Sequence, residues 1–336
     1  MNTAVFPKLN PNFNESRHPL SGDERLAAQG VLAAIGRHFT NFQGSYRQAY
    51  DAMTEWTPIA DGVTLDVVDE RDARGWWVRP SDAPADRVIL FIHGGAYALG
   101  SAKAYRGFVS QIVGRTGVAA FVLDYPLAPE YPFPAAYEAV VAARRWLGGQ
   151  GFERIALVGD SAGGGLALAT LRNATDTLPS VAAVVVFSPW TDLALAGESI
   201  HAPEERDPIF QPAVLAGAAK TYLGEADPKD HRASPLYAIS AELPPIAIQV
   251  GTAELLLDDA RRYAALAAES GGEVRLEIFE GLHHVFQRSV VELASARQAL
   301  DMASAFIAAH WQPSQLLKDD RTVSTLHSPR TGATGT

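Results

Sequence analysis

Short, uninterrupted apolar runs recur along most of the chain, separated by segments whose apolar residues return every three to four positions. Uninterrupted runs of this length are typical of strands that are buried on both faces. The longer period between them predicts amphipathic helices. Because the two patterns alternate, the sequence predicts an α/β fold with a mostly parallel sheet and helices on both of its faces.

The pattern predicts eight strands, of which the first two form an antiparallel pair. They span Val63–Val68, Trp76–Val78, Arg87–His93, Val118–Asp124, Ile155–Gly159, Val181–Phe187, Ile246–Gly251 and Val274–Phe279. The clearest helical patterns cover Asp23–Phe39, Tyr46–Trp56, Ala104–Thr116, Ala135–Leu147, Ala162–Ala174, Asp258–Ser270 and Val290–Trp311.

Changes in this rhythm predict the domain organisation. Residues 1–56 form an extended arm, polar up to residue 22, and two helices of a cap, and residues 57–187 form the first part of the core. Residues 188–243 contain no strand pattern and several prolines, so we expect an insertion that joins the cap. Residues 244–312 complete the core, and the polar residues 313–336 are expected to be a disordered tail.

Composition narrows the classes of function. The 336 residues carry 28 basic and 38 acidic side chains, a net charge of −10, which argues against a nucleic-acid partner. The absence of cysteine excludes disulfides, thiolate metal sites and a cysteine nucleophile. No apolar stretch is long enough to span a membrane, and the N-terminus lacks the apolar core of a secretory signal. We therefore expect a cytoplasmic protein, and leave a homodimer open beside a monomer.

The segment Gly159-Asp160-Ser161-Ala162-Gly163 fits the pattern G-x-S-x-G. In this pattern a serine stands on a sharp turn between a strand and a helix, where small flanking residues allow the backbone to pack closely. A buried strand pattern precedes Ser161 and a helical pattern follows it. Ser161 is therefore the predicted nucleophile.

Glycines after an earlier strand predict an oxyanion hole. His93-Gly94-Gly95 directly follows the strand that begins at Arg87, and glycine lets backbone N–H groups approach a developing oxyanion closely. We expect the donors to be the N–H groups of Gly94, Gly95 and Ala162. We assign His93 and Asp124, both at strand ends, structural rather than catalytic roles.

A serine nucleophile of this kind needs an acid and a histidine further along the chain. Glu254 lies in the loop after the seventh strand, and Asp258 lies where a helical pattern has begun. This placement favours Glu254 as the acid and leaves Asp258 as the alternative. His283 and His284 both follow the last strand, and their positions alone leave the base open between them.

Four segments together resemble the hormone-sensitive-lipase family of α/β-hydrolase esterases. They are HGGAY from His93, DYPLAPEYPFPAA from Asp124, GDSAGG from Gly159 and SPWTDL from Ser188. The resemblance implies an α/β-hydrolase fold with a helical cap, and it places the family's catalytic histidine on His284. The chain departs from the family pattern in two places, with Ala96 at the last glycine of the oxyanion motif and Glu254 at the usual aspartate.

These features predict a serine carboxylester hydrolase that acts on short- to medium-chain acyl esters through an acyl-enzyme. Ser161 is the nucleophile, His284 the general base and Glu254 the residue that orients it. No metal is expected, because the histidines show no metal-ligand spacing, and this mechanism requires no organic cofactor. A lactone hydrolase, an amidase and, from another class, a small-ligand receptor without catalysis remain alternatives.

Overall fold

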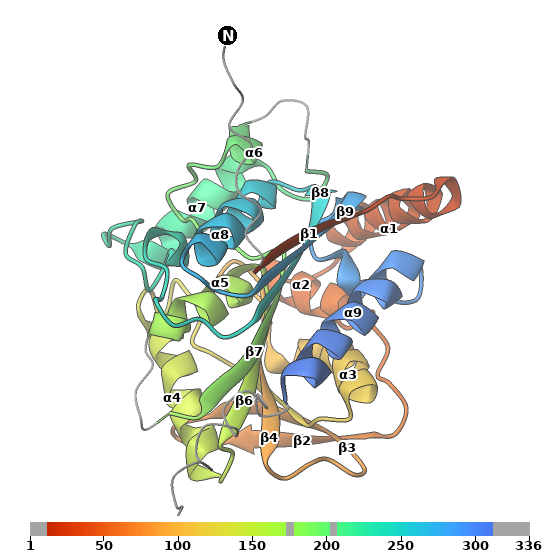
Figure 1. Ribbon diagram of the computed structural model, residues 1–336. Helices are drawn as coiled ribbons and strands as arrows, with labels where there is room; N and C mark the ends of the chain where they lie inside the picture. The colour runs from red at the N-terminus through yellow and green to blue at the C-terminus, as the bar shows by residue number, and fades with distance from the viewer. Residues whose placement is uncertain (1–11, 173–177, 202–206, 312–336) are drawn as a thin grey trace, which may run out of the picture.

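One nine-stranded sheet organises the molecule in the computed structural model (Figure 1). The structure describes residues 12–172, 178–201 and 207–311. In these residues the strand order is β1-β9-β8-β7-β6-β4-β5-β3-β2. The strands are β1 (Phe13–His18), β2 (Val63–Asp69), β3 (Arg74–Pro80), β4 (Arg87–Ile92), β5 (Ala120–Leu123), β6 (Arg154–Asp160), β7 (Ser180–Phe187), β8 (Ile246–Ala253) and β9 (Val274–His283). β3 is antiparallel to β2 and β5, and all other neighbours are parallel.

The predicted number of eight strands is wrong, because the N-terminal arm contributes a ninth. Residues Phe13 to His18 pair in parallel with Val274 to Phe279 at the edge of the sheet. The segment reads FNESRH, and three of its residues are half-buried while the other three are exposed. A polar strand that is half exposed at an edge carries little of the apolar signal on which the prediction rests.

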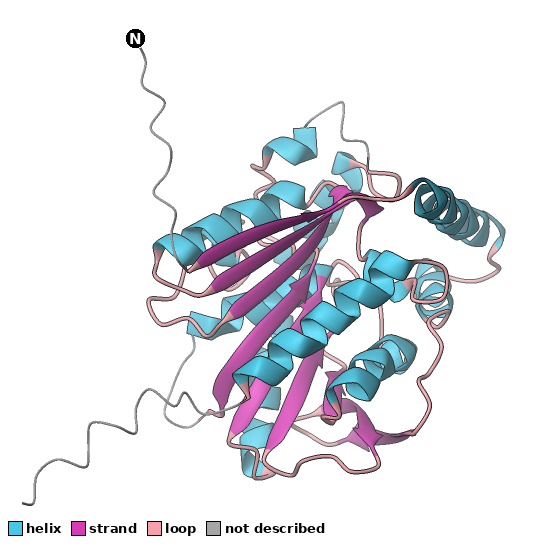
Figure 2. Cartoon of the chain, turned by 45° about the vertical axis from the view of Figure 1, so that its right-hand side comes forward, coloured by secondary structure: helices cyan, strands magenta, loops and turns pink. Residues whose placement is uncertain are grey.

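Helices cover both faces of the sheet, as predicted (Figure 2). In β4, Val88, Leu90 and Ile92 belong to one apolar core, and Ile89 and Phe91 belong to the other. The first core includes α4 (Ala135–Gly149), α5 (Ser161–Ala169), α7 (Pro212–Leu223) and α8 (Leu257–Glu269), and the second includes α3 (Ala102–Thr116) and α9 (Ala294–His310). This double burial explains why the central strands are uninterrupted apolar runs.

Some helix boundaries differ from the prediction. The helix after Ser161 ends at Ala169 and continues as a 3₁₀ turn, η1 (Thr170–Arg172). The last helix begins at Ala294, four residues later than predicted, because a 3₁₀ turn, η3 (Phe286–Arg288), and an irregular stretch precede it. The predicted disordered tail, residues 313–336, lies outside the described residues.

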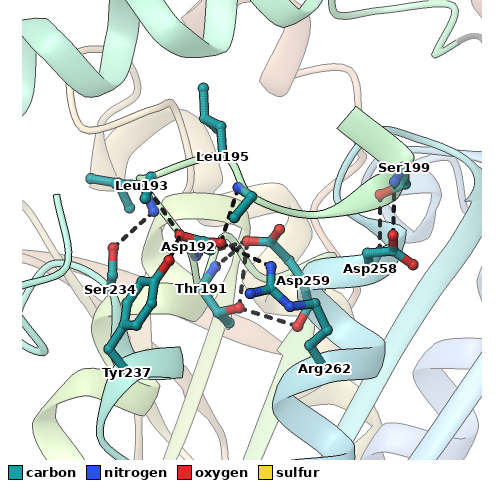
Figure 3. Close-up of polar contacts among 12 residues, drawn as sticks. Thr191, Asp192, Leu193, Leu195, Ser199, Ser234, Tyr237, Asp258, Asp259 and Arg262 are labelled. Atoms are coloured by element: carbon teal, nitrogen blue, oxygen red, sulfur yellow. Dashed lines mark hydrogen bonds and ion pairs between the residues drawn. The ribbon is translucent and has the colours of Figure 1, made fainter. Parts of the chain in front are cut away.

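The insertion contains α6 (Glu198–His201), α7 and a 3₁₀ turn, η2 (Pro235–Tyr237), and its described residues contain no strand after β7 ends at Phe187. A buried polar cluster ties it to α8 (Figure 3). Asp259 accepts hydrogen bonds from the backbone N–H groups of Thr191 and Asp192 at 2.7 and 2.8 Å, and Arg262 contacts Asp192 at 2.8 Å. Burial raises the pKa of Asp259 to about 8, and the neighbouring carboxylate of Asp192 adds to the effect.

Two N-terminal helices, α1 (Gly22–Asn41) and α2 (Tyr46–Thr54), precede the core. Ser21 caps α1, and Ser45 and Gln48 form a capping box at α2. In Figure 1, α1 runs outward beside β9. Among the described residues, none of the helices has the length and apolar character that a membrane crossing requires.

Candidate active site

Ser161 occupies a sharp turn at the carboxyl end of β6, where α5 begins. Its φ of 52° is in the left-handed region, which costs a non-glycine residue free energy and persists where the surroundings enforce it. The two flanking glycines are required by space. A Cβ on Gly163 would lie 2.0 Å from the carbonyl oxygen of Ile92, and one on Gly159 would lie 2.7 Å from the backbone of Gly163. The turn therefore has the form that the G-x-S-x-G pattern predicts.

Glu254 and His284 meet at the ends of two adjacent parallel strands, β8 and β9. The Nδ1 atom of His284 lies 2.7 Å from Oε2 of Glu254, and both residues are buried. A proton on Nδ1 satisfies this contact and leaves Nε2 of the neutral ring as an acceptor. His284 and Ser161 line the same cavity.

The second oxygen of Glu254 is also occupied. Its Oε1 accepts hydrogen bonds from the hydroxyl of Ser188 at 2.8 Å and from the N–H of Gly251 at 2.7 Å. The same Ser188 oxygen accepts the N–H of Val285, the residue after His284, at 3.1 Å. Ser188 thus fixes the carboxylate relative to the histidine loop. Ser188 begins the SPWTDL segment, and no role was predicted for it from the sequence.

The alternatives to Glu254 and His284 lie in other surroundings. Asp258 accepts the N–H of Ser199 at 2.7 Å and forms a 3.8 Å ion pair with Arg261 on α8, so it holds the insertion and makes no contact with His284. His283 is buried beside the cavity, and burial lowers the pKa of its imidazole to about 3. It is therefore neutral across the physiological range.

The oxyanion prediction is wrong for Gly94. Its N–H donates to the buried carboxylate of Asp160 at 2.8 Å, which removes it as a donor to a substrate. Gly95 and Ala96 follow with φ values of 115° and 52° and line the cavity. Within the described residues, their N–H groups have no hydrogen-bond acceptor. Ala162 is in the first turn of α5, where backbone N–H groups have no partner within the helix.

His93 and Asp124 have the structural surroundings that were predicted for them. The ring of His93 stacks on Tyr125 at a centroid distance of 4.3 Å, and its Nδ1 lies 2.7 Å from the carbonyl oxygen of Gly94. Asp124 accepts the N–H of Ala102 at the start of α3 at 2.6 Å. Both side chains brace the backbone around the glycine loop.

A chain of buried hydroxyls runs from Asp160 to Arg288, and sequence reasoning missed it. Tyr105 donates to Oδ2 of Asp160 at 2.9 Å, and its oxygen lies 2.9 Å from that of Tyr50 on α2. Arg288, on η3, donates to the oxygen of Tyr50 at 3.5 Å. Burial raises the pKa of Asp160, and the charge of Arg288 opposes that shift. The residues come from four separate segments, so no local pattern announces them.

A cavity of about 140 Å³ opens above Ser161. Residues of both predicted cap segments line it together with the core. Those from α1 and α2 are Val31, Ala34, Ile35, Phe39, Tyr46, Tyr50 and Met53, and those from the insertion are Trp190, Ile209, Phe210 and Leu215. The N-terminal helices and the insertion therefore share one apolar wall over the nucleophile. Among the described residues, no three His, Asp, Glu or Cys side chains gather as a metal site requires.

Comparisons with known proteins identify the fold and the family. The family model of the α/β hydrolase fold matches residues 89–288. An acetyl-hydrolase of Streptomyces hygroscopicus is 40% identical over 264 residues, which are 78% of this chain and 88% of that protein. An esterase of Acinetobacter venetianus is 35% identical over 226 residues, 66% of this chain and 74% of that one.

Solved structures show the same fold over most of the chain. The crystal structure of an esterase from the bacterial hormone-sensitive lipase family superposes with a TM-score of 0.79 at 35% identity, covering 85% of this chain and 99% of that one. The chain therefore belongs to the hormone-sensitive lipase family of α/β-hydrolases and is a serine hydrolase of the esterase type.

Proposed function

We propose that the protein hydrolyses short- to medium-chain carboxylic esters through a covalent acyl-enzyme on Ser161. The observation that carries the proposal is a single cavity that holds both Ser161, on its strained turn, and His284, whose Nδ1 lies 2.7 Å from Glu254. A nucleophile, a base and a group that orients the base are the parts that acyl transfer requires.

The proposed reaction has two halves. Nε2 of His284 takes the proton of Ser161 while Oγ attacks the acyl carbon, and the imidazolium then protonates the departing alcohol. Water, deprotonated by the same nitrogen, attacks the acyl-enzyme and releases the acid. Glu254 holds the ring in the tautomer with a proton on Nδ1 and stabilises the imidazolium as it forms.

We assign the stabilisation of the tetrahedral oxyanion to the N–H groups of Gly95, Ala96 and Ala162. Gly95 and Ala96 both line the cavity, and neither N–H has an acceptor among the described residues, so both are free to donate to an oxyanion that forms there. Ala162 adds a donor from the first turn of α5, whose positive dipole end also favours negative charge. Ala96 takes the place that the sequence prediction gave to Gly94.

The size of the cavity supports short and medium acyl chains. An apolar cavity of about 150 Å³ accommodates a molecule the size of benzene, and the cavity here measures about 140 Å³. The similarity to a protein named acetyl-hydrolase points in the same direction. The side chains of Ile35 and Phe39, both on α1, limit the space available to an acyl chain.

Covalent labelling tests the nucleophile. A fluorophosphonate should modify the wild-type protein at Ser161, as located by peptide mass spectrometry, and should leave Ser161→Ala unlabelled. His284→Ala should lose labelling and esterase activity, whereas His283→Ala should keep a substantial fraction of both. An unlabelled wild-type protein, or equal labelling of Ser161→Ala, would refute the proposal.

A substrate panel tests the chain length and the type of bond. With p-nitrophenyl esters, kcat/KM should be highest between acetate and hexanoate, and Phe39→Ala should shift the optimum toward longer chains by enlarging the cavity. Ala60→Gly, on the loop after α2 and outside the cavity lining, is the matched control. Lactones and anilides of the same acyl groups belong in the panel, and faster turnover of either would favour that alternative.

A further inference from the structure

Arg288 is a cation at the cavity that forms no ion pair with a carboxylate of the described residues. Arg288 follows the His284 loop directly and lines the same cavity as Ser161. A guanidinium has five N–H donors and stays charged at every relevant pH. Only Nη1 is used, in long contacts of 3.5 Å to the hydroxyl of Tyr50 and 3.3 Å to that of Thr54. Within the described residues, Nε and Nη2 have no acceptor.

No carboxylate of the described residues lies within 4 Å of the Arg288 guanidinium, the limit for an ion pair. The nearest anionic group in its hydrogen-bond chain is Asp160, which it reaches only through the hydroxyls of Tyr50 and Tyr105. The guanidinium carbon also lies 5.7 Å from the ring centroid of Tyr50 and 5.9 Å from that of Tyr105. Arg288 is half-buried, and a charge that has lost part of its water gains from a partner of opposite charge, so this half of the guanidinium is suited to a partner that arrives with a ligand.

The other titratable groups around the cavity leave that position available. His283 is neutral, because burial lowers its pKa to about 3. Glu254 is engaged by His284 and by two further donors. Glu292 also lines the cavity, but it is solvent-exposed and forms no ion pair with Arg288 among the described residues. Its charge opposes an incoming anion weakly, through water.

We propose that Arg288 binds a carboxylate carried by the substrate, so that the preferred substrates are small esters with a second, anionic carboxylate group. The inference rests on the proposed esterase function and deepens it. The guanidinium fork matches the planar carboxylate and can bind it through two N–H groups. The rest of the cavity wall is mostly apolar, which suits the short hydrocarbon link between the two functional groups.

The chemistry of hydrolysis is unchanged by this anchor. Water cleaves the acyl C–O bond, and the products are the free alcohol and the free acid, one of which keeps the second carboxylate. Arg288 exchanges no proton and forms no covalent bond. It acts by holding the substrate with its ester group at Ser161, which is a role in specificity.

Substrate pairs that differ only in charge test the proposal on the wild-type protein. Monomethyl glutarate and methyl 5-amino-5-oxopentanoate differ by a carboxylate against a neutral amide on the acyl side. Acetoxyacetate and 2-acetoxyacetamide make the same comparison on the alcohol side. In a pH-stat assay, the anionic member of at least one pair should have the higher kcat/KM, by about 10- to 100-fold, the range for a hydrogen bond to a charged group.

Variants connect that preference to Arg288. Arg288→Gln should reduce the ratio of kcat/KM for the anionic ester to that for its amide to about one. Arg288→Lys keeps the charge but loses the paired N–H groups of the guanidinium, so it should retain part of the ratio. It also controls for the possibility that Arg288→Gln misfolds. Arg79→Gln, which loses a surface ion pair with Asp66 on β2 and β3, is the matched control and should leave the ratio unchanged. Glu292→Gln should raise it slightly.

The outcomes separate this inference from the proposed function. Hydrolysis of neutral esters with no preference for either anionic partner, or a preference that survives Arg288→Gln in a folded protein, overturns the role of Arg288 and leaves the esterase proposal intact. Failure to hydrolyse any ester, with Ser161 unlabelled by the fluorophosphonate, overturns the esterase proposal, and this inference with it. A ratio that falls in the order wild type, Arg288→Lys, Arg288→Gln supports the assignment.

Discussion

Two carboxylates five positions apart in the sequence, Glu254 and Asp259, are both fully buried and have opposite surroundings. Both oxygens of Glu254 have partners, namely two donors on Oε1 and His284 on Oε2. In Asp259 one oxygen accepts two backbone N–H groups, while the other has no partner among the described residues. Burial raises the pKa of Asp259 to about 8, so it keeps its proton near neutral pH.

The difference shows that burial alone does not identify a catalytic acid. Glu254 directly follows the carboxyl end of β8. Ser161 follows β6 and His284 follows β9 at the same end of the sheet. Asp259 lies on the first turn of α8, where it faces the insertion. Glu254 is placed to meet a histidine that becomes charged. Asp259 serves as a hydrogen-bond anchor for the insertion (Figure 3). Each role makes a separate measurable prediction.

The largest effect is expected at Glu254. Glu254→Ala should lower kcat by about 10³- to 10⁴-fold, because His284 loses the partner that sets its tautomer and stabilises its cation. Steady-state kinetics on a short p-nitrophenyl ester, with circular dichroism to verify folding, measures it. Asp258→Ala is the matched control, since Asp258 contacts Ser199 instead of the histidine; it should keep kcat within a few-fold and lower the unfolding temperature. The reverse pattern would transfer the acid role to Asp258.

Most of the site was predictable because its residues follow strong local signals. Ser161 is preceded by a buried strand, and Glu254 follows another such strand directly. The choice of His284 over His283 came from family resemblance, since position alone left both open. Gly94 was misassigned because a glycine pattern indicates close backbone approach without telling which N–H group a buried aspartate already occupies. The polar edge strand β1 escaped for want of an apolar signal.

The parts that were not predicted depend on contacts between distant segments. Arg288 meets Tyr50 across more than two hundred residues, and Ser188 meets Glu254 across 66. Asp259 is one of two adjacent aspartates in the first turn of a helix. At such a position the sequence alone predicts a solvated carboxylate that the helix dipole stabilises. Its burial arises from the insertion that folds over it, and no pattern within the helix encodes that.

Asp259 should have its effect on stability rather than on catalysis. The folded protein holds this proton up to about pH 8, whereas the unfolded chain releases it near the ordinary value of 3.8. Between these values the folded state binds more protons, so its contribution is fully present below about pH 4 and is lost as the pH rises through 8. The slope is up to about 1.4 kcal/mol per pH unit. Asp259→Asn mimics the neutral acid. The free energy of unfolding in urea should therefore depend less on pH in this variant than in the wild type between pH 5 and 9.

His283 provides a smaller effect of opposite sign. Its pKa is about 3 in the folded protein and 6.5 ordinarily, so the unfolded chain binds the extra proton between these values. Stability from this group is present above pH 6.5 and is lost as the pH falls toward 3. His283→Gln should therefore lose less free energy of unfolding than the wild type between pH 6.5 and 4.5. Equal slopes for the two proteins would mean that His283 is accessible to protons in the folded state.

Ser188 tests how finely Glu254 is positioned, and its effect should be the smallest. Ser188→Ala removes the 2.8 Å hydrogen bond to Oε1 and the acceptor of the Val285 N–H, while Gly251 and His284 keep their contacts with the carboxylate. One hydrogen bond contributes about 0.5–1.5 kcal/mol, which corresponds to a decrease in kcat of about 2- to 12-fold. KM should stay constant because Ser188 does not line the cavity.

Ser188→Cys, whose thiol is a weaker donor, should have a kcat between those of the wild type and Ser188→Ala. A change in KM instead would show that Ser188 shapes the substrate pocket. Ser188 would then no longer support the view that Glu254, unlike Asp259, is held in place for catalysis.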